Sequence, residues 1–249
     1  KVPIKSNLGR ISYGIRWVKP SGESGTKKYS KDDFVSSVSS NIKEIQEANK
    51  RLGFDIVDFI KDGYSLPDKG FKLKISSIEN RDGDGDEVAF NMVIYDVKSN
   101  DVAVTLTRAI NVLDKSMYHD TFFIDSSYQK SGLGTSITEQ AEKTYMKYKI
   151  EEIYLTANAS VGGYAWARMG FDFRLDSDRE RIKNSFMRKL YLLKLPLEEK
   201  SKAMEAVNSF THAWEFANFK PFGKDFMLGT TWEAYKILNP NHITYKIGE

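Results

Sequence analysis

The segment 122–141, FFIDSSYQKSGLGTSITEQA, constrains the fold more than any other part of the chain because its hydrophobic pattern changes twice. Its apolar start is typical of a strand that runs into a glycine-bearing loop. Apolar residues then recur at helical spacing, at Leu133, Ile137, Ala141, Tyr145 and Tyr148. The pattern therefore predicts a strand, a short loop and an amphipathic helix.

The predicted loop has the features of an anion site. Glycine at 132 and 134 lets the backbone approach a ligand closely. The first N–H groups of a helix have no partner within it, and the helix dipole adds positive charge, so a diphosphate would be suited. Lys130, Ser131 and Thr135 can add side-chain donors. A turn that uses glycine for geometry alone explains the loop equally well.

Two other phosphate motifs do not fit this loop. A P-loop is excluded because no Gly-Lys-Ser/Thr follows a four-residue spacer. A dinucleotide fingerprint fits poorly because the third glycine and a ribose-binding acid are missing.

The segments around the loop predict a mixed fold. Period-two patterns predict an antiparallel meander, with strands at 71–78, 87–97, 102–110 and 117–125. Helices are expected at 30–45 and at 52–62. A strand at 153–157 and a short helix closed by Gly170 follow. The strands at 122–126 and 153–157 are separated by a helix, which predicts that they form a parallel pair.

The C-terminal part reads as helical. Residues 178–219 predict two helices, ended by Pro196 and Pro221, and the tail has strand candidates at 226–228 and 232–237. We therefore expect one domain at 1–175. The remaining segment, 176–249, is expected to be a helical extension or insertion with a strand-like tail, packed on the same domain.

Composition argues against several functional classes. With 37 basic and 34 acidic residues the charge is too balanced to indicate nucleic-acid binding. The lack of cysteine excludes disulfides and thiolate zinc sites and fits the cytoplasm. A membrane partner is not expected because no apolar run is long enough to span a bilayer. The first residue is Lys1, so we expect a trimmed chain or a piece of a longer one.

Two motifs in this chain resemble those of the Gcn5-related N-acetyltransferases. Residues 129–134, Gln-Lys-Ser-Gly-Leu-Gly, are similar to that family's Gln/Arg-x-x-Gly-x-Gly/Ala signature. The segment 153–173, IYLTANASVGGYAWARMGFDF, is similar to its second motif, a strand with a terminal Asn before a helix that ends in Gly-Phe. The resemblance covers roughly residues 5–175. It implies an α+β (mixed α/β) fold with a mostly antiparallel sheet, one splayed parallel strand pair and flanking helices, plus a C-terminal helical appendage.

The resemblance also implies an activity and a cofactor. Members transfer an acyl group, here an acetyl group from acetyl-CoA or another acyl-CoA, to an amine by direct attack. The acceptor stays open among small amines, peptide N-termini, lysine side chains and aminoacyl-tRNA, and a homodimer also stays open. The residues that the resemblance assigns to the cofactor are Phe123, Ile124, Asp125, Gln129, Lys130, Ser131, Gly132, Leu133, Gly134, Thr135, Asn158 and Trp166.

Catalytic residues are harder to assign from the sequence. Many family members place a tyrosine acid where this chain has Trp166, and an indole N–H is not a useful acid. Tyr164 is the nearest phenol, about 200° away around the helix. His119 and Asp120 are the candidate bases, and strand alternation lets at most one of them face a cleft.

A second function therefore stays open beside the enzyme. The chain could be a catalytically weak or inactive binding module on the same fold, as part of a larger toxin- or phage-associated protein. Trp166 in place of tyrosine favours this alternative. The acidic turn at 82–86 does not continue as a calcium loop, because Glu87 and Val93 occupy positions that need Gly and Glu.

Overall fold

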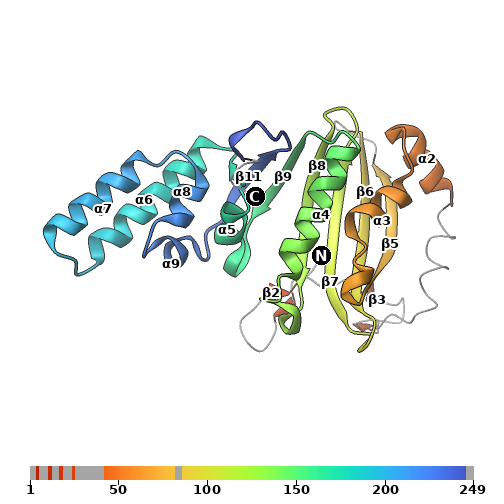
Figure 1. The fold of residues 1–249 in the computed structure, drawn as a ribbon, viewed down its shortest axis with the longest axis horizontal. Helices are drawn as coiled ribbons and strands as arrows, with labels where there is room; N and C mark the ends of the chain where they lie inside the picture. Colours follow the sequence, from red (N-terminus) through yellow and green to blue (C-terminus); the bar gives the residue numbers. More distant parts are fainter. Residues whose placement is uncertain are drawn as a thin grey trace. The chain divides into compact units, whose positions relative to one another are not determined.

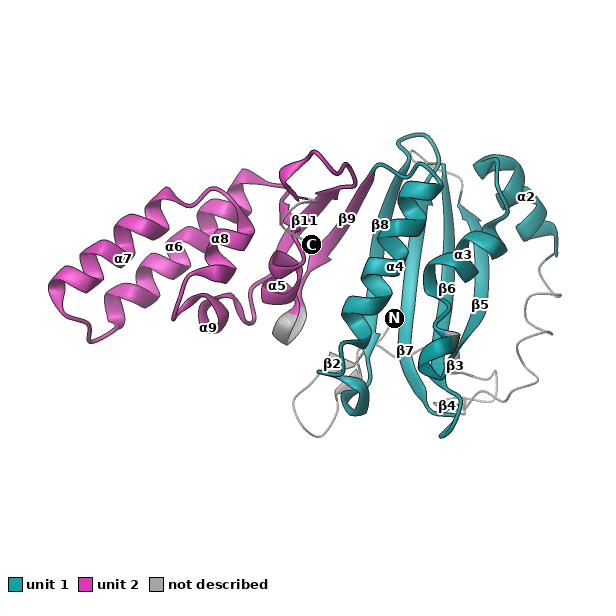
Figure 2. Cartoon of the chain, viewed as in Figure 1, with its two compact units in different colours: residues 1–151 teal, residues 152–249 magenta. Residues whose placement is uncertain are grey.

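The computed structural model describes residues 4–5, 11–12, 17–18, 24–25, 42–81 and 86–244. It divides into two compact units, residues 1–151 and 152–249 (Figures 1 and 2). The boundary lies within the first domain expected from the sequence. Among the described residues, no helix has the length and apolar character needed to cross a membrane.

The first unit contains the predicted meander. Its strands are β5 (Phe71–Arg81), β6 (Glu87–Asp96), β7 (Val102–Asn111) and β8 (Ser116–Ile124). Consecutive strands pair antiparallel, with register partners such as Leu73↔Ile94 and Leu106↔Phe122. The strands are joined by tight turns, in which Asn100 and Lys115 adopt the positive φ that such turns need. Two two-residue strand pairs precede the meander, β1 (Ile4–Lys5) with β2 (Ile11–Ser12) and β3 (Trp17–Val18) with β4 (Ser24–Gly25).

Helices α3 and α4 lie side by side in the first unit (Figure 1). Helix α2 is Ile42–Leu52, α3 is Ile56–Tyr64 and α4 is Leu133–Lys147. The predicted stripe of α4 is buried from Leu133 to Tyr145. Of the helix expected at 30–45, the part before residue 42 lies outside the described residues.

The start of α3 differs from the prediction of a helix from residue 52. Gly53 with φ 75° ends α2. The Asp55 side chain then accepts hydrogen bonds from the N–H groups of Val57 at 2.8 Å and Asp58 at 3.0 Å. This side-chain cap fixes the new helix start at Ile56.

The second unit combines a small sheet with several helices. Its elements in chain order are β9 (Glu152–Ala157), α5 (Ala159–Arg168), β10 (Asp172–Phe173), α6 (Asp176–Leu192), α7 (Leu197–Ser209), α8 (Ala213–Asn218), α9 (Gly223–Met227) and β11 (Trp232–Ile237). β11 pairs antiparallel with both β9 and β10. Aromatic rings pack edge-on in the core, for example Phe186 and Phe216 at 5.1 Å between centroids.

Two predictions for this unit are corrected. The second predicted helix is interrupted between α7 and α8, where Phe210 is extended and Glu215 caps a new helix through the N–H of His212. The strand candidate at 226–228 is wrong, because Phe226 and Met227 belong to helix α9. The candidate at 232–237 is confirmed as β11, so helices α6–α9 lie in the chain between two strands of one sheet.

The fold class is the predicted one. The chain is mixed α/β, with a mostly antiparallel sheet that includes one parallel strand pair, and with flanking helices.

Candidate functional site

Strand β8 leads into the glycine-bearing loop and determines which backbone groups face away from β7. The Asp125 N–H donates to the Ala103 carbonyl at 2.9 Å, so Asp125 faces β7. Because backbone groups alternate along an antiparallel strand, Phe123 also faces β7 and Ile124 faces away from it. Of the three predicted strand residues, only Ile124 therefore directs its backbone groups away from β7.

Side chains of the predicted site shape the loop from within. Asp125 accepts from the Ser127 N–H at 2.9 Å and caps a short 3₁₀ turn, Ser126–Tyr128. The Gln129 amide donates to the Ile124 carbonyl at 3.0 Å, and the Ser131 hydroxyl donates to the Tyr128 carbonyl at 2.6 Å. These side chains are thus occupied in holding the loop, which leaves its backbone to meet a ligand.

Tyr128 ties the loop to the neighbouring strands. Its ring meets Phe71 edge-on, with centroids 5.9 Å apart. Its hydroxyl lies 3.2 Å from the Ser99 hydroxyl in the turn between β6 and β7. The start of the loop is therefore anchored to the neighbouring strands before α4 begins.

The backbone of the loop forms a concave row of donors. Lys130 has φ 64° and Gly132 has φ 80°, so left-handed residues alternate with Ser131 between them. The first helical bond runs from the Ser136 N–H to the Gly132 carbonyl at 3.0 Å. Over residues 125–136, all of which are described, the structure gives no acceptor to the N–H groups of Lys130, Ser131, Gly132, Gly134 and Thr135.

The two glycines serve different purposes. A Cβ at Gly134 would lie 2.9 Å from the Ile124 Cδ1 atom, so glycine allows the first turn of α4 to approach the end of β8. Around Gly132 the space is open, and the positive φ is what favours glycine there. Gly132 is also exposed, so its N–H can reach a ligand.

Two lysines add positive charge beside these donors. Lys130 is exposed within the loop. Lys69, in the 3₁₀ turn Pro67–Lys69, donates through Nζ to the Ser136 hydroxyl at 2.5 Å. Sequence reasoning missed Lys69, because nothing in its own segment links it to a loop so far along the chain. Together with the helix dipole, these cations make the loop suited to an anion.

His119 does not lie where the predicted general base would have to act. It is 5% exposed, and its Nε2 atom lies 3.0 Å from the Tyr145 hydroxyl. Burial holds the pKa of His119 well below its ordinary value, and the nearby charge of Arg108 lowers it further. A base must reach the proton that it removes, so this burial argues against the predicted role.

The polar groups around His119 form a closed cluster in the core. Tyr145 hydrogen-bonds the Tyr64 hydroxyl, and burial raises the pKa of both phenols. Arg108 is 2% exposed and donates to the carbonyls of Thr121 at 2.6 Å and Thr107 at 2.9 Å. No carboxylate within the described residues pairs with Arg108.

Asp120 has the opposite environment. The register between β7 and β8 shifts between Thr107 and Arg108, which leaves Asp120 as the extra residue of a bulge. Asp120 is exposed while His119 is buried. Asp120 is therefore the accessible one of the two predicted bases.

The remaining predicted residues lie in the second unit. Asn158 is the exposed N-cap residue of α5 and makes no side-chain cap hydrogen bond. Tyr164 and Trp166 are both half-buried, and Trp166 packs edge-on against Phe171 with centroids 5.0 Å apart. The second residue of the Gly162-Gly163 pair lets α5 approach another segment closely, since a Cβ at Gly163 would clash with Thr230.

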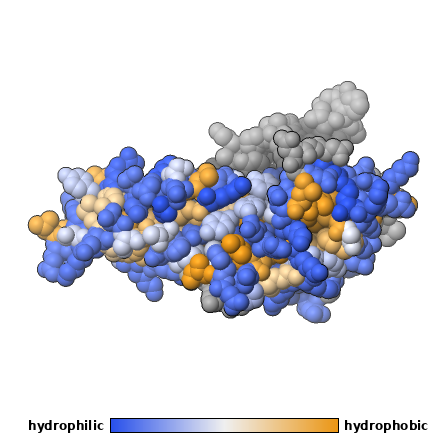
Figure 3. Space-filling view, turned by 90° about the horizontal axis from the view of Figure 1, so that it is seen from above, coloured by the Kyte–Doolittle hydropathy of each residue, from blue (hydrophilic) through white to orange (hydrophobic). Residues whose placement is uncertain are grey.

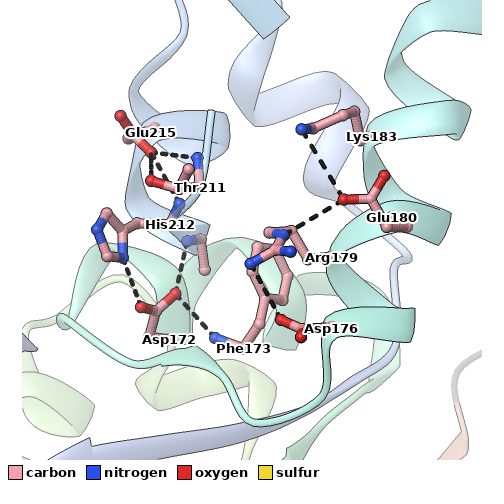
Figure 4. Close-up of polar contacts among 10 residues, drawn as sticks. Asp172, Phe173, Asp176, Arg179, Glu180, Lys183, Thr211, His212 and Glu215 are labelled. Atoms are coloured by element: carbon pink, nitrogen blue, oxygen red, sulfur yellow. Dashed lines mark hydrogen bonds and ion pairs between the residues drawn. The ribbon is translucent and has the colours of Figure 1, made fainter. Parts of the chain in front are cut away.

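The second unit also contains a polar cluster that sequence spacing did not reveal (Figure 4). Asp172 is buried and accepts from the backbone N–H groups of Phe173 at 2.8 Å and Ala213 at 2.9 Å. Its other oxygen lies 2.7 Å from the His212 Nδ1 atom. This contact anchors the start of α8 to β10. Within the described residues, no group of three or more His, Asp or Glu side chains could hold a metal ion.

Comparisons with known proteins give fold-level likeness only. No protein-family model matches the sequence, and no curated protein matches it significantly. A nourseothricin acetyltransferase aligns over 42% of this chain and 85% of its own, at 10% identity and TM-score 0.34. An acetyltransferase of the GNAT family from Staphylococcus aureus aligns over 86% of this chain and 98% of its own, at 12% identity and TM-score 0.34. An acetyltransferase from Bacillus cereus aligns over 53% of this chain and 71% of its own, at 11% identity and TM-score 0.24.

Proposed function

We propose that this chain binds an acyl-CoA, with its diphosphate on the loop 129–135, and transfers the acyl group to an amine. The observation that carries the proposal is the row of backbone N–H groups without an acceptor in this fully described segment, those of Lys130, Ser131, Gly132, Gly134 and Thr135. Left-handed residues and a helix start form such a concave site, and diphosphate is an anion of matching size.

Each part of the first unit has a role in this proposal. The N–H groups at the start of α4 hold the diphosphate, and Lys130 and Lys69 balance its charge. The Ile124 N–H, which faces away from β7, offers a hydrogen bond to an amide-containing arm, while the Ile124 carbonyl accepts from the Gln129 amide. Gln129 and Ser131 keep the loop in the required shape.

The chemistry needs an activated acyl group and a neutral amine. The bound thioester supplies the first. For the second, we assign Asp120 the role of accepting the amine proton, directly or through water, because it is the accessible one of the two predicted bases. His119 is a positioning residue in the core and takes no part in proton transfer.

The second function, a binding module without efficient turnover, is favoured by one observation. The Trp166 ring packs edge-on against Phe171 in the second unit. Packing of this kind explains the tryptophan without any catalytic role. Such a module would bind acyl-CoA through the same loop but transfer nothing.

Titration calorimetry with acetyl-CoA and with S-acetylpantetheine tests the binding step. The two ligands share the thioester and the amide arm, but only the first carries a diphosphate. We expect heat from acetyl-CoA alone. Equal affinity for both ligands, or none for acetyl-CoA, would contradict the assignment of the loop.

A thiol-release assay over a panel of amines then separates the two functions. The panel should contain polyamines, a peptide with a free N-terminus and a lysine-containing peptide with a blocked one. Release above the rate without amine identifies an acyltransferase and its acceptor class. Binding without release across the panel supports the binding module.

A further inference from the structure

The connection between α6 and α7 exposes apolar side chains at the end of a helical hairpin. Tyr191 is 69% exposed, Leu192 73% and Leu197 84%. These residues lie on either side of the turn 193–196, which joins the two helices. We call this cluster the hairpin tip. Hydrophobic side chains are exposed at the corresponding end of the space-filling view (Figure 3).

The tip is not an incomplete part of the core. Helix α6 buries a separate stripe, formed by Ile182, Phe186 and Leu190. Lys200 of α7 reaches back to α6, where its Nζ donates to the Tyr191 carbonyl at 2.9 Å and lies 5.5 Å from the ring centroid of that residue. The two helix ends are thus held together, and the apolar side chains point outward from an ordered structure.

Basic residues outnumber acidic residues in the segment that contains the apolar tip. The segment 188–202 contains five basic and two acidic residues. Of the acidic pair, Glu198 is bound to Lys202 at 2.6 Å. Arg188 and Lys194 are exposed, and within the described residues neither has an ion-pair partner. The surface therefore fits a partner that is apolar at its centre and negatively charged around it.

A lipid surface fits this tip better than a protein partner does. A stable protein interface buries about 800 Å² on each side, and three side chains at a convex end offer much less. A bilayer needs no matching groove, because its interface adapts to a protruding side chain. Anionic headgroups attract lysine and arginine beside the inserted residues, and tyrosine favours the interfacial depth.

We propose that the hairpin tip attaches the protein to an anionic lipid surface. Leu192 and Leu197 enter the apolar edge of the bilayer, Tyr191 lies at headgroup depth, and Lys194 with Arg188 binds the headgroups. The sequence predicted no membrane partner because a spanning segment is missing. Attachment through a tip requires no such segment.

Flotation of the full chain with phospholipid vesicles tests this proposal. Vesicles of phosphatidylcholine with about one third phosphatidylserine should carry the protein upward, and vesicles of pure phosphatidylcholine should carry at least about tenfold less. Raising the salt concentration should weaken binding, because it screens the lysine contribution. No binding to the phosphatidylserine vesicles at low salt would overturn the proposal.

Substitutions locate the contact. The double variant Leu192→Ser/Leu197→Ser should lose at least about tenfold in vesicle affinity, and Lys194→Glu a smaller factor. Leu113→Ser is the matched control, because Leu113 is 70% exposed but stands in the β7–β8 turn. Thermal melts should be alike in all variants, since the side chains are exposed.

Two results would overturn the assignment of this surface. One is unchanged vesicle binding in the double variant. The other is a concentration-dependent dimer that the double variant abolishes while vesicle binding persists. In that case the tip would be an interface between two copies of this chain.

Discussion

Two polar regions of the first unit adjoin strand β8 and differ in exposure and in hydrogen bonding. One is the loop 129–135, and the other is the closed cluster of Tyr64, Arg108, His119 and Tyr145. The loop is exposed and leaves backbone donors without acceptors. The cluster is buried, and its hydrogen bonds run among its own side chains and to strand carbonyls, although the Arg108 Nε atom has no hydrogen-bond partner among the described residues. Because an unmade hydrogen bond costs little in water and much in the core, open donors suit a ligand while closed ones stabilise a fold.

The closed cluster stabilises the irregular pairing between β7 and β8. Arg108 binds one carbonyl on each side of the irregular pairing, Thr107 on β7 and Thr121 on β8. It thereby holds the bulge that directs Asp120 outward. The cluster therefore positions the site without belonging to it.

The largest expected effect is a loss of acetyl-CoA affinity when the exposed loop is changed. Gly132→Glu places a carboxylate among the N–H donors and forces a side chain into φ 80°. We expect the Kd for acetyl-CoA to rise at least about 100-fold, equivalent to about 2.7 kcal/mol. Calorimetry measures the affinity, and a thermal melt reports the stability of the same sample.

Gly53→Glu provides the matched control. Gly53 also has a positive φ, 75°, and open space where a Cβ atom would lie, but it stands at the end of α2. Both variants should therefore lose a similar amount of stability, on the order of 1 kcal/mol. If acetyl-CoA affinity falls equally in both, or in neither, the loop is not the binding site.

The next effect is a loss of stability when the buried cluster is changed. Arg108→Met preserves much of the side-chain volume but removes the donor to the buried Thr107 carbonyl and the part-buried Thr121 carbonyl. We expect the free energy of unfolding to fall by roughly 2 kcal/mol, because unsatisfied carbonyls cost more than the removal of a buried charge regains. Urea denaturation measures this loss. Where the variant is folded, acetyl-CoA affinity should change less than about threefold. Intact stability with lost affinity would place Arg108 in the binding site.

A smaller effect concerns the pH dependence of the closed cluster. Burial holds the pKa of His119 below its unfolded value, so below about pH 6.5 the unfolded chain binds more protons than the folded one. Stability should therefore decrease as the pH falls through this window, by up to about 1.4 kcal/mol per pH unit. The neighbouring groups are Arg108, Tyr64 and Tyr145, and none of these side-chain types titrates there.

His119→Gln removes this contribution. Urea denaturation at pH 7.5 and 5.5 should give a smaller difference for the variant than for the unchanged protein. Equal differences would mean that His119 takes up its proton in the folded state, as an accessible base would. That result would restore the role first predicted for it.

The same contrast explains what the sequence could predict. The loop was predictable because its strand, glycines and helix are consecutive in the chain, and so is the apolar stripe of α4 up to Tyr145. The cluster was not, because its members come from four elements, and His119 alone carries no sign of burial. The position of Lys69 was invisible for the same reason. The split between α7 and α8 was missed because Phe210 continues the apolar spacing of a helix although its backbone is extended.

The smallest expected effect concerns Tyr164, which belongs neither to the loop nor to the closed cluster. It is a half-buried phenol in the second unit. If it were the acid that protonates the leaving thiolate, Tyr164→Phe would remove a function and not only a contact. The thiol of CoA is acidic enough to leave without an acid, so we expect turnover to change less than about twofold. Trp166→Tyr, which introduces a phenol about 200° further around the helix, should preserve or raise turnover. Thiol release at saturating acetyl-CoA measures both, with calorimetry to show that affinity is intact. A loss of tenfold or more in Tyr164→Phe at unchanged affinity would identify Tyr164 as the acid, because only the chemical step distinguishes tyrosine from phenylalanine there.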